Sequence, residues 1–288
     1  MLKTVWLTDN KNTDKGTAML LGGFDGLHVG HRRLLSCAKK SGLSVGLMTI
    51  VGCKNGESLF TFEERERIFR DSGVDFVFEL PFEEIKDLSP KAFLQLLERE
   101  FSPKLYICGE DFRFGAKAEG TPKMIQEDTH VRVEILPLVE YNGEKVSSTT
   151  VKKLLTDGNV AAAATLLGER YFLIGEVVKD RQVGRTLGFP TANILYPSGK
   201  YPLKIGVYET RVCLDGKTYK GITNFGARPT FEDETVLTET YLDGFSGELY
   251  GKSLKVEFVR FLRDIERFES VDKLREQLTK DIRQVRDE

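Results

Sequence analysis

The sequence lacks the features that would place it in a specialised class of protein. No apolar run approaches the roughly 18 residues of a membrane span, and the N-terminus has no apolar signal-peptide core. Its 42 Lys and Arg nearly balance 44 Asp and Glu, and this net charge of −2 argues against a dedicated nucleic-acid binder. We therefore expect a cytoplasmic protein with no membrane or nucleic-acid partner. The oligomeric state stays open.

Cysteine pairs and the common phosphate-binding motif are also missing. The four cysteines contain no CxxC pair and lie at Cys37, Cys53, Cys108 and Cys213. This spacing is typical of reduced thiols in a cytosolic protein rather than of disulfides or a metal cluster. The sequence has no GxxxxGK[ST] loop, so any phosphate site must be built in another way.

The first half of the chain alternates short apolar runs with helical patterns. Strands are expected at 18–21, 43–51, 75–80, 104–108 and 131–136. One helix between them begins with Thr61 and Glu64 as a capping box and stops at Gly73, and another opens with Ser89 and Pro90. Strands that alternate with helices predict βαβ units and a mostly parallel sheet in an α/β domain.

The pattern changes near residue 170. Two short helices broken at Gly158 precede this point, and runs rich in β-branched residues follow it. These runs are 172–178, 206–214, 217–225, 235–242 and 253–262. A last helix begins at Ser270. The pattern predicts an antiparallel β-barrel with a terminal helix, and hence two domains, 1–168 and 169–288.

The stretch LLGGFDGLHVGHRRLL, residues 20–35, combines glycines with a buried strand and a helix start. The strand ends at Leu21, and Gly22 and Gly23 let the chain turn and let a ligand approach the backbone. The helix is expected to begin near Gly30. Its free N–H groups would then face the turn, where they favour an anion.

Two of the three histidines, His28 and His31, lie in this stretch three residues apart. At a helix start this spacing lets both rings face one point, where they could donate to a phosphate oxygen. They form a poor metal site, because the third histidine, His130, is far away in the sequence. Taken alone, the pattern fits a strand–helix turn with incidental histidines equally well.

Two later motifs favour a ligand site over that alternative. CGEDFRFG (108–115) follows a strand with Glu110, Asp111 and Arg113, and SSTTVKK (147–153) brings hydroxyls and lysines to another helix start. The carboxyl ends of parallel strands meet at one edge of a sheet, where open α/β folds bind ligands. We therefore expect the three motifs to lie together there.

The stretch VGRTLGFPTANI (183–194) forms a second dense motif. Gly184 and Gly188 permit a backbone cradle for phosphate. Thr191 and Asn193 offer hard oxygens suited to Mg²⁺ that is held partly through phosphates. The alternative is a glycine-containing loop between two barrel strands.

The first-domain motifs resemble the FMN adenylyltransferase module of the bacterial bifunctional riboflavin kinase/FAD synthetases, which is similar to the HxGH nucleotidyltransferases. The resemblance implies that His28 and His31 stabilise the transferring phosphoryl group. It implies contacts to ATP and its phosphates from Gly22, Gly23, Phe24, Asp25, Ser147, Ser148, Thr149 and Lys152. It also implies a flavin/nucleotide cleft at Gly109, Asp111 and Phe112.

The sequence of the second domain resembles the riboflavin kinase of the same family. The resemblance lies in the motifs PTAN, GVYETRV, NFGARPTF and ETYLDGFSGELYG. The resemblance implies that Glu239 is the general base for the riboflavin hydroxyl and that Thr191 and Asn193 serve Mg²⁺ and phosphates. A lone strand glutamate is usually only solvated, so this role of Glu239 depends on the resemblance. Arg228 and Phe231 receive no role.

The first domain departs from the family pattern at two places. TIVGCKNGESLFTF has neither the proline nor the histidine usual in that loop, and Lys152 stands where the family has arginine. Lysine keeps the charge but loses the paired hydrogen bonds of a guanidinium.

The function expected from the sequence is therefore ATP- and Mg²⁺-dependent phosphorylation of riboflavin to FMN and adenylylation of FMN to FAD. Two alternatives stay open. One is a riboflavin kinase whose first domain has decayed into a scaffold. The other is a non-catalytic flavin- or nucleotide-binding sensor, which would have no use for a general base.

Overall fold

The computed structural model describes residues 3–7, 16–52, 57–179, 191–227 and 236–287. The chain forms two compact units, of which the first contains 1–56 and 62–148 and the second contains 57–61 and 149–288. The sequence pattern put the boundary at 168. Helices α6 (Ser148–Thr156) and α7 (Val160–Leu167), broken at Gly158 as expected, belong with the second unit apart from Ser148. The short segment 57–61 also joins the second unit, which no sequence pattern indicated.

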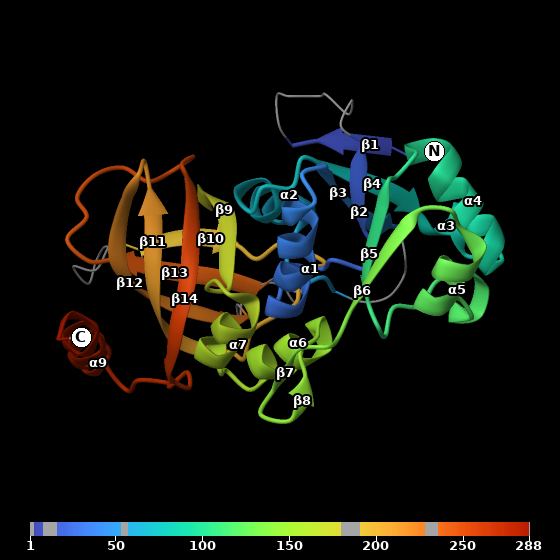
Figure 1. Ribbon diagram of the computed structural model, residues 1–288. Coiled ribbons are helices and arrows are strands. Elements are labelled where there is room, and N and C mark those ends of the chain that lie inside the picture. Colours follow the sequence, from blue (N-terminus) through green and yellow to red (C-terminus); the bar gives the residue numbers. More distant parts are fainter. Residues whose placement is uncertain (1–2, 8–15, 53–56, 180–190, 228–235, 288) are drawn as a thin grey trace. The chain divides into compact units, whose positions relative to one another are not determined.

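The first unit is built on a six-stranded sheet with the order β1-β4-β3-β2-β5-β6 (Figure 1). Its strands are β1 (Lys3–Trp6), β2 (Thr17–Leu20), β3 (Ser44–Val51), β4 (Phe76–Pro81), β5 (Leu105–Gly109) and β6 (Arg132–Leu136). The pairings among β2 to β6 are all parallel, as the sequence predicted. The four-residue edge strand β1 was not predicted, and it pairs antiparallel with β4.

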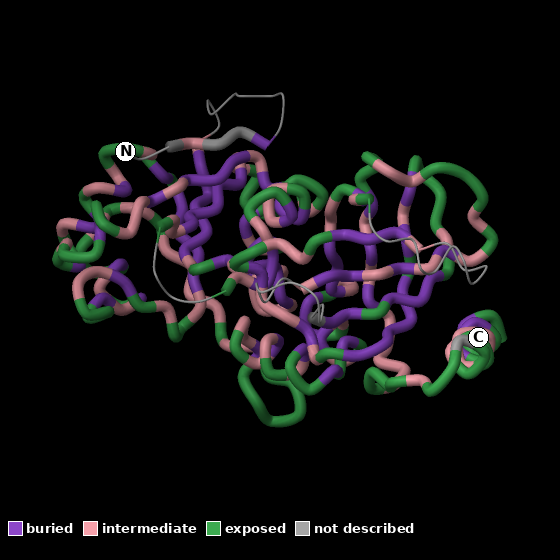
Figure 2. Tube along the Cα trace, turned by 180° about the vertical axis from the view of Figure 1, so that it is seen from behind, coloured by how far each residue is buried: buried purple, intermediate pink, exposed green. Residues whose placement is uncertain are grey.

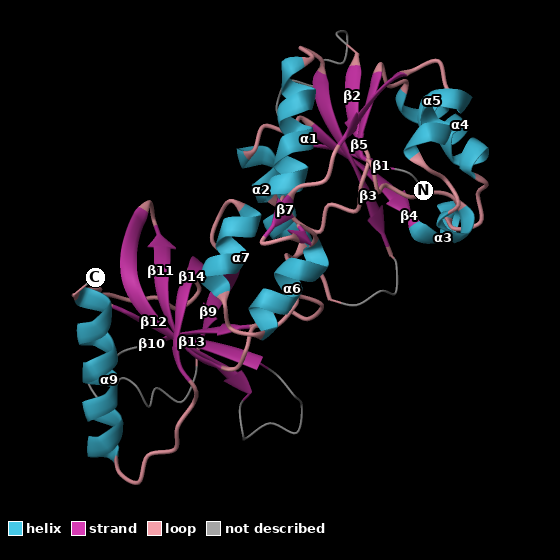
Figure 3. Ribbon diagram, turned by 60° about the horizontal axis from the view of Figure 1, so that its bottom comes forward, coloured by secondary structure: helices cyan, strands magenta, loops and turns pink. Residues whose placement is uncertain are grey.

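Helices cover both faces of this sheet. Helices α1 and α2 lie on one face and α3, α4 and α5 on the other (Figure 3). Their bounds are α1 (Val29–Lys40), α2 (Phe62–Asp71), α3 (Phe82–Ile85), α4 (Pro90–Phe101) and α5 (Pro122–Asp128). The predicted N-cap of α4 is confirmed, because Ser89 Oγ accepts from the amide of Ala92 at 3.3 Å. A 3₁₀ turn, η1 (Ala116–Ala118), and the hairpin β7 (Glu140–Tyr141) and β8 (Glu144–Lys145) complete the unit.

The second unit contains a closed barrel with the strand order β10-β13-β12-β11-β14-β9. The strands are β9 (Phe172–Val178), β10 (Thr191–Leu195), β11 (Gly206–Leu214), β12 (Lys217–Ala227), β13 (Val236–Leu242) and β14 (Ser253–Arg263). Helix α9 (Val271–Arg286) begins after Ser270, whose hydroxyl accepts from the amide of Lys273. The barrel and its terminal helix are as predicted. Thr191, Ala192 and Asn193 of the PTAN motif lie in strand β10.

The buried residues follow the strands of both units (Figure 2). Fully buried aromatic side chains include Phe76 and Tyr106 in the first unit and Tyr208 and Phe258 in the second. The three cysteines that the structure describes are free thiols. No helix in the described ranges has both the length and the apolar character to cross a membrane.

Candidate functional site

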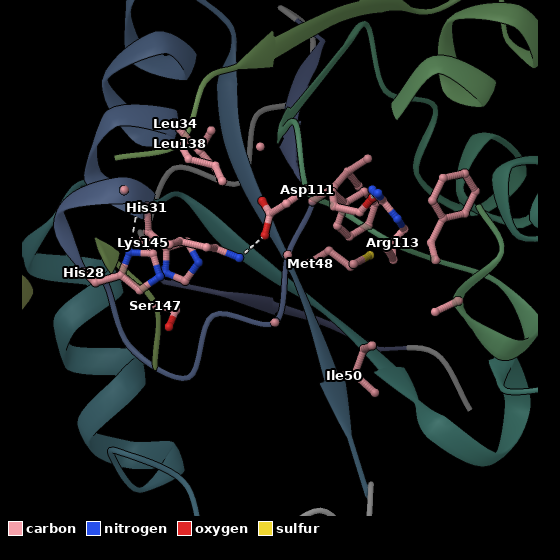
Figure 4. Close-up of a pocket in the computed structure, with 18 of the residues that line it drawn as sticks. His28, His31, Leu34, Met48, Ile50, Asp111, Arg113, Leu138, Lys145 and Ser147 are labelled. Atoms are coloured by element: carbon pink, nitrogen blue, oxygen red, sulfur yellow. Dashed lines mark hydrogen bonds and ion pairs between the residues drawn. The ribbon is translucent and has the colours of Figure 1, made fainter. Parts of the chain in front are cut away.

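The first unit contains a cavity of about 700 Å³ at the carboxyl end of its parallel strands. Figure 4 shows its polar part, where His28 and His31 face Lys145 and Asp111. The turn after β2, the start of α1, the end of β5 and the residues around β8 contribute to the wall. The other part is apolar and is lined by Met48, Ile50, Phe82, Ile85, Phe93, Phe112 and Phe114. The first two motifs of the sequence, and Ser147 of the third, thus meet at one sheet edge.

His28 caps helix α1 with its own side chain. The ring is 8% exposed, and its Nδ1 accepts a hydrogen bond from the amide of His31 at 3.2 Å. The helix begins at Val29, one residue before the predicted start. One of the N–H groups expected to face an anion is therefore satisfied inside the protein.

His31 packs between His28 and Phe24. Its ring lies 3.6 Å from that of His28 at an interplanar angle of 17°, and 4.5 Å from that of Phe24. Its Nδ1 donates to the carbonyl of Gly26 at 2.9 Å. The two rings therefore form a stacked pair with fixed orientations.

Both histidines are neutral at pH 7 in this structure. Burial, with smaller contributions from the neighbouring His31 and Lys145, lowers the pKa of His28 to about 3. Burial also lowers the pKa of His31 to about 4, although the Gly26 carbonyl and Asp111 oppose this effect. Strongly shifted pKa values in a cavity are typical of functional sites.

Lys145 lies between the two histidines and Asp111, a residue of the expected flavin/nucleotide cleft. Its ammonium group forms an ion pair with the Asp111 carboxylate, and both side chains are about half exposed. Ser147 lines the same wall. Sequence reasoning missed Lys145, and its signal would have been a basic residue two positions before the hydroxyl run SSTT.

In the turn after β2, Gly23 leaves room on the cavity side, whereas a Cβ at Gly22 would lie 2.9 Å from the Phe24 ring. A Cβ at Gly23 would meet no atom within 4 Å, whereas one at Gly30 would approach the His28 ring to 3.0 Å. Phe24 has a φ of 41°, a strained value for a residue with a side chain, and is 1% exposed. Phe24 thus packs against the side of the His31 ring that faces away from His28. Phe24 and Asp25 are not among the residues that line the cavity.

The cleft and helix residues expected from the resemblance are only partly brought together. Gly109, Asp111 and Phe112 all line the cavity, as does Ser147. Ser148 is the first residue of α6 and the last of the first unit, whereas Thr149 and Lys152 belong to the second unit.

Lys152 has two contacts within the second unit. Its ammonium group donates to the carbonyl of Glu57 at 2.6 Å and lies 5.3 Å from the Tyr201 ring.

Two cavities adjoin in the barrel. One of about 310 Å³ is mostly apolar and contains Glu239, and the other, of about 270 Å³, contains Asn193. Thr191 lines both cavities. Thr191 on β10 therefore lies at the border between the two cavities. The Glu239 carboxylate is on one side and the Asn193 amide on the other.

The three polar side chains Thr191, Glu239 and Asn193 differ in their hydrogen bonding. Thr191 Oγ1 donates to Glu239 Oε1 at 2.8 Å, so the carboxylate is oriented by its neighbour strand. Asn193 stands opposite Glu239 in the β10–β13 pairing and is 5% exposed. Its Oδ1 is buried and has no hydrogen-bond partner among the residues that the structure describes. An unpaired buried acceptor lowers the stability of the folded protein unless a ligand binds to it.

Sequence reasoning also missed a wall of the Glu239 cavity. Leu274, Leu278 and Ile282 of α9 line it, and Arg263 holds the helix through the carboxylate of Asp281, 2.8 Å away. The i, i+4, i+8 spacing of the three apolar residues was the available signal. Gly184, Gly188, Arg228 and Phe231 lie outside the described residues.

Comparisons with known proteins also divide the chain into two parts. A family model described as FAD synthetase matches residues 10–150, and one described as riboflavin kinase matches 167–288. A bifunctional riboflavin kinase/FMN adenylyltransferase of Bacillus subtilis is 30% identical, over 97% of this chain and 96% of that protein. The protein of the same description from Escherichia coli is 32% identical over 93% and 91%.

A solved structure from Streptococcus pneumoniae, described as a macrolide-efflux protein, has the same fold. Its TM-score is 0.88, with 29% identity over 96% of both chains.

Proposed function

The chain belongs to the family of bifunctional riboflavin kinases/FMN adenylyltransferases, and from this membership we propose which side chains carry its two reactions. The protein phosphorylates riboflavin to FMN and then transfers the adenylyl group of ATP to FMN, giving FAD and diphosphate. Its substrates are ATP and flavins. We keep residue 168 as the boundary between the two activities.

Adenylyl transfer is assigned to the large cavity of the first unit. The polar part, with His28, His31, Lys145 and Ser147, suits the phosphates, and the phenylalanine-lined part suits the isoalloxazine ring. An oxygen of the FMN phosphate attacks the α-phosphorus of ATP, and the bond from that phosphorus to the bridging oxygen of the diphosphate breaks. The protein forms no covalent intermediate. It aligns two anions and neutralises the charge between them.

The phosphate contacts of this reaction remain predictions for Gly22, Gly23, Phe24, Asp25, Ser147, Ser148, Thr149 and Lys152. Gly22, Gly23 and Ser147 line the cavity and are the best supported of the set. Phe24 is fully buried against His31, which favours an indirect role for its side chain.

Riboflavin phosphorylation is assigned to the two barrel cavities. The apolar cavity holds the flavin, and Glu239 removes the proton from its 5′-hydroxyl as general base. ATP occupies the Asn193 cavity, so that its γ-phosphoryl group reaches the flavin oxygen past Thr191. Gly184 and Gly188 remain predicted phosphate contacts.

The barrel residues fit a magnesium ion that accompanies ATP. Asn193 offers a buried oxygen without a partner, and Thr191 Oγ1 keeps its lone pairs because it donates to Glu239. Both are neutral, hard oxygen ligands, as Mg²⁺ prefers when phosphates supply the negative charge. When bound, the ion would neutralise charge on the phosphates.

The further proposals concern where the protein acts and which partners it has. With a net charge of −2, it is expected to act in the cytoplasm on small molecules alone, without nucleic acid or membrane.

The Thr191–Glu239 hydrogen bond at the border of two cavities is the observation that carries the kinase assignment. The decisive experiment incubates the purified full chain with riboflavin, ATP and Mg²⁺ and separates the flavins by chromatography. Formation of FMN and FAD supports the proposal. FMN alone would favour a first unit that has decayed into a scaffold, and no conversion would favour a sensor.

A further inference from the structure

The backbone fixes the two stacked histidines of the first cavity in different tautomers. His28 Nδ1 lies 3.2 Å from the amide nitrogen of His31, and an amide N–H can only donate. The neutral His28 ring therefore carries its proton on Nε2. His31 Nδ1 lies 2.9 Å from the carbonyl oxygen of Gly26, which can only accept. The neutral His31 ring therefore carries its proton on Nδ1, and its Nε2 has a lone pair.

This difference decides which ring can become positively charged. A second proton on His28 would have to go to Nδ1, where it would oppose the amide proton of His31 and break the N-cap of α1. A second proton on His31 goes to Nε2 and strengthens the bond from Nδ1 to Gly26. Only His31 can become an imidazolium ion without loss of a hydrogen bond that holds the turn.

The surroundings of His31 explain why it is neutral before a ligand binds. His28 stacks on one side, Phe24 packs on the other, and the charges that act on the ring are those of Lys145 on β8 and Asp111 after β5. Burial and Lys145 lower the pKa of His31 to about 4, whereas Asp111 raises it. Phosphate oxygens beside the ring act in the same direction as Asp111 but with more negative charge.

We propose that His31 takes up one proton from solvent at Nε2 when nucleotide phosphates enter the first cavity, while His28 stays neutral and donates from its own Nε2. The proposal rests on the proposed adenylyl-transfer function and deepens it. The two histidines then do different work: His31 supplies a positive charge, and His28 supplies a neutral donor of fixed direction. The only bond formed in this step is N–H at His31.

The chain has only three histidines, which makes a direct test practical. The full-length protein is labelled with ¹⁵N-histidine, and the ring nitrogens are followed by NMR at pH 7 as α,β-methylene-ATP and Mg²⁺ are added. His130 is exposed and does not line the cavity, so it serves as the internal reference. His31→Gln and His28→Asn assign the signals. Asparagine preserves the N-cap acceptor, which keeps the second variant folded.

The expected result is a shift of His31 Nε2 from the unprotonated to the protonated range, with His28 Nδ1 still unprotonated and His130 unchanged. Calorimetry in buffers of different ionisation enthalpy gives a second measure. Wild type should take up about one proton more on binding than His31→Gln, because nucleotide binding in the barrel is common to both.

Two results would overturn the inference while leaving the proposed function intact. These are protonation of His28 Nδ1, or movement of both histidine signals with both rings still neutral. If neither His28 nor His31 signals move at saturating nucleotide, the cavity does not bind it, and the proposed function of this cavity fails together with the inference.

Discussion

Thr191 donates a hydrogen bond to Glu239 across strands β10 and β13, with 2.8 Å between the two oxygens. Thr191 is also the residue shared by the two barrel cavities. The Glu239 carboxylate in one cavity is therefore hydrogen-bonded to the residue that borders the other. If flavin and nucleotide occupy these cavities as proposed, the geometry would bring the flavin hydroxyl and a phosphoryl group to the same point.

The first prediction concerns Glu239→Gln. Glutamine keeps the shape and can accept from Thr191, but it cannot take a proton. FMN formation should fall by roughly 10²- to 10⁴-fold, the usual contribution of a general base. Conversion of added FMN to FAD by the same variant is the internal control, because Glu239 lies outside the first unit. An equal loss of both reactions would contradict the assignment.

The second prediction contrasts two buried polar residues of neighbouring strands. Asn193 Oδ1 has no partner, whereas Thr238 Oγ1 donates to the carbonyl of Ile194 at 3.0 Å. Asn193→Val should abolish FMN formation and leave the free energy of unfolding unchanged or raised, since an unpaired buried acceptor costs about 1–3 kcal/mol. Thr238→Val should lower that free energy by about 1 kcal/mol and leave turnover near wild type.

Chemical denaturation and flavin chromatography measure these two quantities on the same samples. A marked loss of stability in Asn193→Val would indicate a structural amide instead of a ligand. Calorimetry adds a check on Mg²⁺, which is expected to bind with nucleotide. Tight uptake of Mg²⁺ by the nucleotide-free protein would be inconsistent with two neutral ligands.

The sequence was sufficient for the architecture because the dominant signals are periodic. Apolar runs separated by capped helices predicted the parallel sheet, and the runs after residue 170 predicted the barrel. The edge strand β1 and the short helix α3 were missed, because four residues carry too little periodicity. The join of 57–61 to the second unit is a long-range pairing, seen in the bridge from Ser58 to Lys200, and no local pattern encodes it.

The site was predicted less completely than the fold. HxGH and PTAN pointed to His28, His31 and Thr191 as candidates, but they did not show that the histidines also have a structural task. His28 caps α1 and stacks on His31, and both facts depend on ring orientations that spacing alone does not give. Lys145 and the α9 residues were missed because their neighbours in the cavity come from distant parts of the chain.

The third prediction follows from the low pKa of His28, about 3 in the folded protein against 6.5 for an ordinary histidine. Between these values the unfolded chain binds a proton that the folded chain does not, so stability falls as pH falls from about 6.5 towards 3. One such group contributes up to about 1.4 kcal/mol per pH unit. His28→Asn keeps the cap acceptor and removes the titration, so its stability should fall less steeply with acid.

The single tryptophan, Trp6, belongs to the first unit, so its fluorescence during urea unfolding can report on that unit. His130→Asn removes a histidine outside the cavity and serves as the matched control. If wild type and His28→Asn showed the same acid slope, His28 would not be buried neutral as the structure indicates.

The last prediction compares Gly23, in the turn after β2, with Gly30, in the first turn of helix α1. Gly23 lines the cavity, and a Cβ there would meet no atom within 4 Å, so Gly23→Ala should fold as wild type does. If phosphates approach the backbone at this point, the methyl group will collide with them, and the KM for ATP in FAD formation should rise at least tenfold, a cost of about 1.4 kcal/mol.

Gly30→Ala should behave in the opposite way. Its Cβ would lie 3.0 Å from the His28 ring, so the ring must shift by a few tenths of an ångström, which strains its capping hydrogen bond. Alanine in a helix is favoured over glycine by about 1 kcal/mol, so α1 itself gains propensity while the histidine pair is displaced. FAD formation should therefore fall mainly in kcat, with FMN formation unchanged. A Gly23→Ala enzyme with normal KM would mean that ATP does not approach this turn, and a fully active Gly30→Ala enzyme would mean that the orientation of His28 is unimportant for adenylyl transfer.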